Sequence, residues 1–479
     1  MNTVVTLAIH KRILTIVVAF IALLFVALVK EWYIMLGVPF MLFTVYAILY
    51  QPKWALFMIA FFVPLSINTD NLFASPMALF VPTEPILIAL LVIYFYVNLL
   101  DNVFENRIFS HPIFLAYCVY LCWILITSLV SMDPVVSFKY LIAHCWLFFP
   151  VFIFTAQFFR DKSNIRTFFW LIVVSMSIVA FYTLIRHSTF AFEEKPAHWV
   201  MEPFFKDHTS YGAILALLFP IVIGLLVSAE KVDFGHSLLY GIIVLLLFAL
   251  VFSYTRAAWL SLVGALGIWG VIYFRIRFST LLIVAAGAAF FFFVSYDSIM
   301  RDLAKNETDS SGDFSEHITS VSNISTDASN LERLNRWDCA MTMYHKKPWM
   351  GWGPGTYQFY YAPFQRAENL TIISTFNADG GNAHSEYLGP LAETGLPGLI
   401  LFSVVVLVVF YRAFRNYHYI EDRRLRILYI SAILGLSTYF IHGFLNNYLD
   451  TDKAAVPVWG IAGLIAAVDL YHTGKKKVV

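Results

Sequence analysis

Long apolar runs, separated by short polar segments, recur along most of the chain. A hydrocarbon core about 30 Å thick requires roughly 17–25 apolar residues in a crossing helix, and fourteen runs come near that length. They cover residues 13–29, 32–50, 54–69, 83–100, 113–131, 139–158, 166–186, 210–229, 237–254, 257–274, 279–297, 395–413, 427–446 and 454–471. Over such a run only a helix satisfies the backbone polar groups in lipid. The pattern therefore predicts an all-α polytopic membrane protein with about 12–14 transmembrane helices and one large, partly helical outer loop.

Composition supports this class of protein and excludes others. Hydrophobic residues make up 60% of the 479 residues and charged residues 13%, against roughly 25% charged in a soluble domain. Lipid must therefore cover most of the surface, so membrane lipids are the first expected partner. The 32 basic and 31 acidic residues nearly cancel, and no basic field indicates nucleic acid as a partner.

Basic residues are unequally divided between the two sides of the predicted membrane. An even number of spans places both termini on one side, and the loops of that side hold eighteen lysines and arginines against seven in the short loops opposite. Because short loops rich in lysine and arginine stay in the cytoplasm, we expect both termini to be cytoplasmic. The long loop, residues 298–394, then faces outward.

This loop divides the chain into three parts. They are residues 1–297 with eleven spans, residues 298–394 as the loop, and residues 395–479 with three spans and a basic tail. Within the loop, residues 306–330 are rich in Ser, Asp, Asn and Thr, which predicts a flexible segment. Apolar residues between 331 and 347 recur at helical spacing, so a helix is expected there, ending before Pro348. The glycines within 351–355 indicate a tight, irregular turn.

Four side chains are candidates for chemistry. Arg256 stands between two apolar runs, where an arginine either faces protein or a polar cavity or snorkels to the lipid interface. Arg333 and Arg336 share one face of the predicted loop helix. They form either a solvated face or an anion clamp, since guanidinium groups match phosphate oxygens. His384 is either a proton acceptor near neutral pH or a structural residue that caps the next helix.

Other chemistry is weakly indicated. Asp379, His384, Glu386 and His345 do not follow a zinc-ligand spacing, and the sequence has no glycine-rich nucleotide loop after a strand. We therefore expect neither a metal nor another cofactor. The aromatic residues of 349–364 are either packing residues or a platform for sugars and lipid head groups.

The same residues carry a resemblance to a known family. The motifs are R-L-N-R-W at 333–337, P-W-M-G-W-G-P-G-T-Y at 348–357, N-A-H-S-E-Y-L at 382–388 and E-T-G-L-P-G at 393–398. Together with T-R-A-A-W at 255–259 and D-H-T-S-Y-G-A at 207–213, they resemble the O-antigen ligase and polymerase superfamily. Thr255 stands where that family usually has serine, and the family usually has fewer spans than the fourteen counted here.

The resemblance implies a metal-independent, inverting glycosyltransferase at the periplasmic face of the bacterial inner membrane. The donor would be a glycan on undecaprenyl diphosphate, and the acceptor a sugar hydroxyl of lipid A–core. A polymerase that joins lipid-linked repeat units is the alternative, and a transporter is less expected. Arg256 and Arg333 would bind the diphosphate, while His384 would take the proton of the acceptor hydroxyl. The residues expected to contact substrate are Arg336, His208, Tyr211, Trp337 and Tyr387.

Overall fold

The computed structural model describes residues 37–70, 79–229, 234–274, 276, 328–365 and 381–473. The chain divides into two compact units, one ending at Leu56 and the other beginning at Phe57. Helix α2 (Val38–Tyr50) belongs to the first unit, and α3 (Pro52–Phe62) contains the boundary. All the candidate site residues belong to the second unit.

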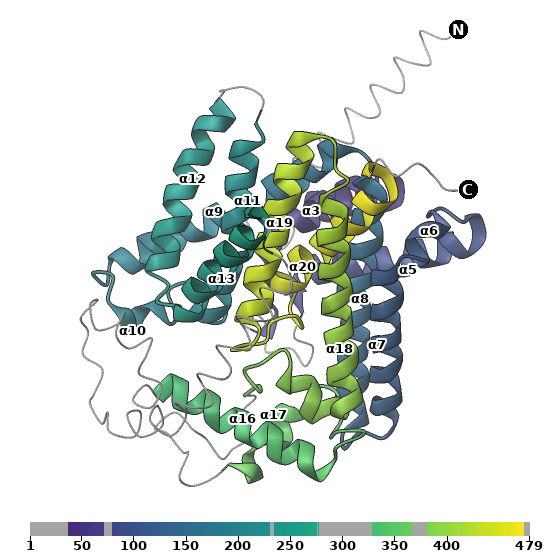
Figure 1. Ribbon diagram of the computed structural model, residues 1–479, viewed down its shortest axis with the longest axis vertical. Coiled ribbons are helices and arrows are strands. Elements are labelled where there is room, and N and C mark those ends of the chain that lie inside the picture. Colours follow the sequence, from purple (N-terminus) through teal and green to yellow (C-terminus); the bar gives the residue numbers. More distant parts are fainter. Residues whose placement is uncertain are drawn as a thin grey trace. The chain divides into compact units, whose positions relative to one another are not determined.

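The second unit is built almost entirely from helices (Figure 1). They are α5 (Thr83–Asp101), α6 (Asn106–Phe109), α7 (Pro112–Leu129), α8 (Pro134–Phe158), α9 (Lys162–Ser188), α10 (Glu194–Ala197), α11 (His208–Val227), α12 (Phe234–Val251), α13 (Arg256–Tyr273), α16 (Ala328–Lys346), α17 (Tyr357–Tyr360), the 3₁₀-helix η2 (Ala362–Phe364), α18 (Leu388–Tyr417), α19 (Arg423–His442), α20 (Asp452–Ala467) and the π-helix η4 (Val468–His472). Strands β1 (Ile67–Asn68) and β2 (Phe80–Val81) pair antiparallel, with Ile67 opposite Val81.

Nine helices in the described part of the chain are long and apolar enough to cross a membrane: α5, α7, α8, α9, α11, α13, α18, α19, and α20 with η4. Each corresponds to one of the predicted spans, which confirms the all-α polytopic fold. The shorter apolar helices α2 and α12 lie at the predicted runs 32–50 and 237–254. The predicted runs 13–29 and 279–297, and most of the segment 306–330, lie outside the described residues.

The run 54–69 differs from its prediction as a single span. Helix α3 has 11 residues and ends at Phe62, so at 1.5 Å per residue it covers about half of a 30 Å hydrocarbon core. Pro64 has no backbone N–H to continue the helical hydrogen bonds. The chain then enters β1 instead of continuing as a helix.

Polar caps and prolines set where the spans begin. At α8, the carboxylate of Asp133 accepts from the N–H of Val136 at 3.2 Å, and Pro134 occupies the first helical position, where its missing N–H costs nothing. At α11, the carboxylate of Asp207 accepts from the N–H of Ser210 at 2.7 Å. Such caps satisfy the N–H groups that the first turn of a helix leaves unpaired.

The spans pack closely through small residues. Helix α11 lies against α19, α20 against α8, and α18 beside α7 (Figure 1). At the first of these contacts, a Cβ on Gly435 would lie 2.2 Å from the carbonyl oxygen of Leu217, so only glycine allows this approach. Helices α16 and α17 gather at the N-terminal end of α18, away from most of the spans. The helix expected from residue 331 to 347 is confirmed as α16.

Candidate functional site

The glycine-rich turn holds the loop against α18. Gly353 has a φ of 119°, a conformation that side chains disfavour. The N–H groups of Gly355 and Tyr357 donate to the two carboxylate oxygens of Glu393, at 2.9 and 3.0 Å. Adjacent N–H groups of this kind suit an anion, and here the protein's own carboxylate occupies them. The turn therefore docks the loop onto α18.

A second glycine breaks α18 where the loop meets the span. Gly395 has a φ of 72°, and a Cβ there would lie 2.4 Å from the carbonyl oxygen of Trp349. The next N–H, of Leu396, donates to the carbonyl of Pro348 at 2.8 Å. Helix α18 thus has a short N-terminal part before this break and a long apolar part after it. The predicted start of the span at residue 395 agrees with this break.

The aromatic residues of 349–364 mostly pack against α16. Tyr357 and Tyr361 stack with their ring centroids 5.4 Å apart and share a buried core with Met343. Packing therefore accounts for Tyr361 and for most of Tyr357, which also contributes to the wall of the cavity described below. Trp349 differs, because it is 67% exposed.

His384 lies just before α18 in a constrained backbone. Its φ of 46° is in the left-handed region, which non-glycine residues seldom adopt and which gathers at functional sites. Its N–H donates to the side-chain oxygen of Asn382 at 3.0 Å, and the indole N–H of Trp337 donates to its carbonyl at 3.3 Å. The hydroxyl of Ser385 caps α18 by accepting from two N–H groups, each at 3.3 Å. Helix capping therefore does not explain His384.

Polar side-chain contacts through Asn446 link His384 to His442 of α19. Oδ1 of Asn446 lies 3.4 Å from Nδ1 of His384, and Nδ2 of Asn446 lies 3.0 Å from Nε2 of His442. The amide oxygen accepts and the amide nitrogen donates. This arrangement gives His384 its proton on Nδ1 and leaves Nε2 with a lone pair.

The two arginines of α16 have different surroundings. Nε of Arg333 donates to the carbonyl of Leu445 at 3.3 Å. Nε of Arg336 donates to Glu332 at 2.6 Å, and its guanidinium lies 3.8 Å from the ring centroid of Tyr361. Both arginines lie within electrostatic reach of His384. Arg336 is thus held by buried internal partners, while Arg333 extends toward the segment that carries Asn446.

Arg256 reaches the same region from α13. The hydroxyl of Thr255 donates to the carbonyl of His208 at 2.8 Å, a bond that serine also makes. Arg256 begins α13 and is partly buried, and both Arg256 and Arg333 lie within electrostatic reach of His208. The structure therefore favours an Arg256 that faces polar protein groups over one that snorkels to lipid.

Two predicted contact residues have internal partners. Tyr211 is 1% exposed and packs against Phe205, with ring centroids 5.5 Å apart. The hydroxyl of Tyr387 donates to the carbonyl of Phe440 at 3.3 Å, and its ring stacks on Phe444 at 4.4 Å. A role for either residue in substrate contact stays a prediction.

The charges of the site are set by burial and by the arginines. Burial, and next the charge of Arg333, lower the pKa of His384 to about 4, so its imidazole is neutral at pH 7. Burial alone would raise the pKa of Asp207. The hydrogen bonds from Ser210 and Thr209 outweigh it and bring that pKa below its ordinary value. The site thus combines a neutral imidazole, a carboxylate and two nearby guanidinium groups.

A cavity of about 310 Å³ adjoins this cluster. Its wall includes Asp207 before α11, and Asn382, Ala383 and Ser385 on either side of His384. Helices α7, α8, α11, α18 and α20 contribute further residues, as do the glycine-rich turn and the segment 447–451. The cavity therefore extends from the candidate site toward the interior of the bundle.

Sequence reasoning missed two residues that organise the site. Asn446 was counted only as the end of a span. Glu386 was considered only as a metal ligand, whereas its carboxylate accepts from the hydroxyl of Tyr439 at 2.5 Å and from the N–H groups of Tyr448 and Leu449 at 2.7 and 2.9 Å. Burial raises the pKa of Glu386 to about 7. The available signal was the pair of adjacent asparagines, Asn446 and Asn447, at the end of an apolar run.

Among the described residues, no group of three or more His, Cys, Asp or Glu side chains is arranged to hold a metal ion. Residues 241–403, about a third of the chain, match the O-antigen ligase family. The match includes Arg256, Arg333 and His384 but not His208, and it confirms the resemblance drawn from the motifs. No curated protein matches the chain.

Proposed function

Residues 241–403 belong to the O-antigen ligase family, and on that premise we propose that the protein is a glycosyltransferase of the bacterial inner membrane. It moves a glycan from undecaprenyl diphosphate to a sugar hydroxyl of lipid A–core. The observation that carries this proposal is that Arg256 and Arg333 lie within electrostatic reach of His208, and that Arg333 and Asp207 lie within electrostatic reach of His384. Two guanidinium groups suit a diphosphate, and a neutral imidazole suits a hydroxyl proton.

The proposed transfer is a single displacement that needs no metal. The acceptor hydroxyl gives its proton to Nε2 of His384, and its oxygen bonds to the anomeric carbon with inversion. The bond from that carbon to the phosphate oxygen breaks, and its electron pair leaves on the diphosphate. Arg256 and Arg333 stabilise the charge that develops there. The activated bond of the donor supplies the driving force, so no nucleotide is consumed.

The donor also strengthens the base in this proposal. Arg333 is among the groups that depress the pKa of His384. A bound diphosphate places negative charge beside that arginine and offsets its effect. His384 therefore accepts a proton more readily when the donor is present.

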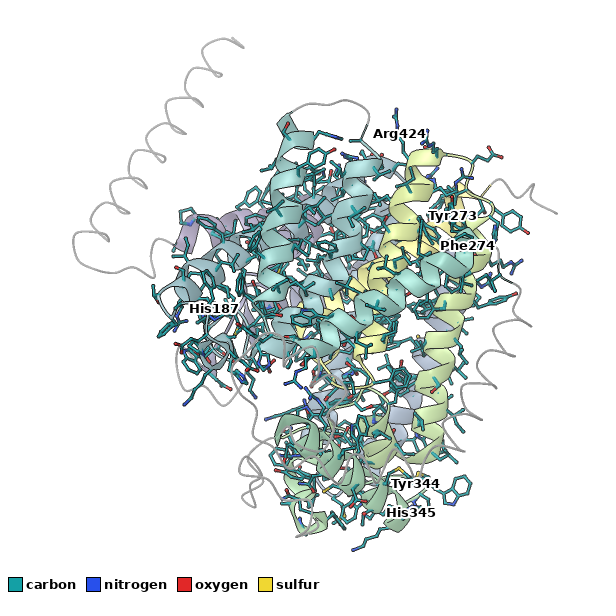
Figure 2. The ribbon with its side chains drawn as sticks, turned by 60° about the vertical axis from the view of Figure 1, so that its left-hand side comes forward. His187, Tyr273, Phe274, Tyr344, His345 and Arg424 are labelled. Carbon is teal, nitrogen blue, oxygen red and sulfur yellow. The ribbon has the colours of Figure 1, made fainter. Side chains whose placement is uncertain are left out.

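Charge placement supports a periplasmic site. Arg424 lies at one end of the second unit, and Tyr344 and His345 of α16 lie at the opposite end (Figure 2). Arg424 belongs to the basic connection between α18 and α19, which the distribution of lysine and arginine assigns to the cytoplasm. The proposed topology therefore places α16 and His384 outside, with both termini inside.

The experiment that tests the function uses protein purified in detergent and a glycan on undecaprenyl diphosphate. Lipid A–core is offered as acceptor, and transfer is read as a gel shift. We expect transfer that continues in the presence of a chelator. A parent protein that moves no glycan to any acceptor contradicts the proposal, and inhibition by the chelator contradicts its metal independence.

The same assay separates the ligase from the polymerase that the sequence resemblance leaves as the alternative. A second lipid-linked repeat replaces lipid A–core as the acceptor. A ladder of longer lipid-linked glycans identifies a polymerase, whereas a product only on lipid A–core identifies a ligase.

A further inference from the structure

The cavity beside His384 differs in chemistry from the arginine cluster. Its volume of about 310 Å³ lies at the lower end of the roughly 300–1,000 Å³ of ligand pockets. Among the described residues that form its wall, Arg256, Arg333 and Arg336 are absent. The cavity and the arginines thus provide two separate places that adjoin the His384 segment.

Two spans contribute tyrosines to the cavity wall. Tyr117 and Tyr120 come from α7, and Tyr140 comes from α8. Tyr117 is 1% exposed, and within the described part of the chain its hydroxyl has no hydrogen-bond partner. A buried hydroxyl without a partner is costly. Its place in a cavity wall indicates that a polar ligand or water supplies that partner.

The cavity wall also carries an amide and a carboxylate, Asn447 and Asp450. Oδ1 of Asn447 is buried and has no hydrogen-bond partner among the described residues. Asp450 has an accessible side chain. Burial among its neighbours raises its pKa to about 6, against the opposing charge of Lys206. Asp450 belongs to the cavity wall and its side chain is accessible, so it is available to accept hydrogen bonds there.

Lys453, one of the two lysines in the wall, is already bound by the protein itself. The ammonium of Lys453 donates to the carbonyls of Val63 and Ser66 at 2.8 and 2.6 Å, and to the hydroxyl of Ser66 at 2.7 Å. An ammonium has three protons, and these contacts use them. The acidic and hydroxyl groups of the wall are therefore better matched to a neutral polyol than to a diphosphate.

We infer that this cavity binds the pyranose ring of the acceptor, an inference that rests on the proposed function. Carboxylate, amide and phenol groups bind the sugar hydroxyls, while Phe204, Phe205 and Phe402 of the wall cover the apolar face of the ring. An inverting transfer brings the incoming hydroxyl and the leaving diphosphate to different sides of the anomeric carbon. The cavity and the arginines supply those two places, and the segment 382–385, whose residues other than His384 line the cavity, lies next to both.

The test compares Michaelis constants for the two substrates. Tyr117→Phe and Asp450→Asn each remove a hydrogen-bonding group and keep the side-chain shape. Each variant should raise KM for lipid A–core roughly threefold to tenfold, the effect of one or two neutral hydrogen bonds. KM for the lipid-linked donor should stay unchanged. Tyr429→Phe is the matched control, because Tyr429 is a buried tyrosine that donates to Ala413 and is absent from the cavity wall.

Either of two results overturns the acceptor site. One is an acceptor KM that stays at the parent value in both variants, and the other is a rise in donor KM instead. If Tyr117→Phe does not yield folded protein on size exclusion, Asp450→Asn decides alone, because its side chain is accessible.

A direct binding measurement separates this inference from the proposed function. Methyl glycosides of glucose, galactose and N-acetylglucosamine are offered to the detergent-purified protein, and saturation-transfer NMR reads binding. We expect at least one signal, weakened in Asp450→Asn and kept in Arg256→Lys. Such signals without any glycan transfer uphold the cavity and overturn the function. Transfer without any glycoside signal overturns the cavity alone.

Discussion

The side-chain oxygen of Asn446 lies 3.4 Å from Nδ1 of His384, on the ring edge opposite the nitrogen that we propose as the base. The same amide reaches Nε2 of His442 at 3.0 Å. Glu386 holds the segment after Asn446 through the N–H groups of Tyr448 and Leu449. The orientation of His384 is thus determined by residues about sixty positions later in the chain, which the helices α11, α19 and α20 bring to one end of the bundle.

Replacement of Asn446 tests whether it orients and tunes the base. The bond from Asn446 raises the pKa of His384 against the effect of burial. In Asn446→Ala, kcat should fall about tenfold to a hundredfold, the range for partners that orient a ligand or base, and the acid limb of activity should move to lower pH. Asn446→Asp adds a negative charge and should move that limb to higher pH. A purely structural role predicts no opposite shifts, so equal acid limbs in the two variants contradict the proposal.

Removal of the imidazole tests the base itself. His384→Gly is the best variant, because glycine adopts a φ of 46° without strain. It should lower kcat by about 10²–10⁴-fold while the protein stays folded and binds the lipid-linked donor. Added imidazole should restore part of the activity, and added zinc should not. His384→Asn should also be inactive, because it lacks the imidazole. The ability of asparagine to cap a helix does not help, since Ser385 caps α18 in either case. Normal transfer by His384→Gly ends the general-base proposal.

The three arginines should separate in their effects on transfer and on stability. Arg333→Lys and Arg256→Lys keep the charge but lose the planar fork, so transfer should fall strongly at an unchanged melting temperature. Arg336→Ala removes one partner of a buried ion pair, which costs about 3–5 kcal/mol, and should lower the melting temperature. Joint replacement of Glu332 and Arg336 by leucine and methionine should recover much of that loss. Wild-type transfer in both lysine variants removes Arg256 and Arg333 from the site.

Local pattern explains why the spans and α16 were predictable. Apolar runs and helical spacing act within one element, and the break at Gly395 is visible as a glycine followed two residues later by a proline. The partners of His384 are different, because the contact with Asn446 depends on how α19 packs against α11 and α20. The contact of Glu393 with the turn at Gly355 was unpredictable for the same reason, since nothing in the sequence around Glu393 indicates it.

Labelling tests the proposed topology. Trp349 is 67% exposed near the outer end of α18, and Arg424 lies at the opposite end of the unit (Figure 2). In protein freed of its native cysteines, Trp349→Cys should react with a membrane-impermeant thiol reagent in intact spheroplasts. Arg424→Cys should react only after lysis, which also serves as its control. The reverse pattern contradicts a periplasmic His384.

The pH dependence should distinguish the free protein from the donor complex. Burial and Arg333 lower the pKa of His384 to about 4, so the neutral base is present at every pH above that value and is lost below it. The acid limb of kcat/KM, which reports the free protein, should therefore lie near pH 4. The acid limb of kcat reports the complex and should lie at higher pH, because the diphosphate offsets the charge of Arg333. Arg333→Gln should raise the pH of the kcat/KM limb and bring the two limbs together.

The stability of the protein should also decrease at acid pH. In the unfolded chain His384 has a pKa of about 6.5, so between about pH 6.5 and 4 it binds a proton in the unfolded state and not in the folded state. Stability should therefore fall as pH decreases from about 6.5 to 4. His384→Gly should remove that part of the decline in a thermal unfolding series, and an unchanged slope contradicts a buried, neutral His384.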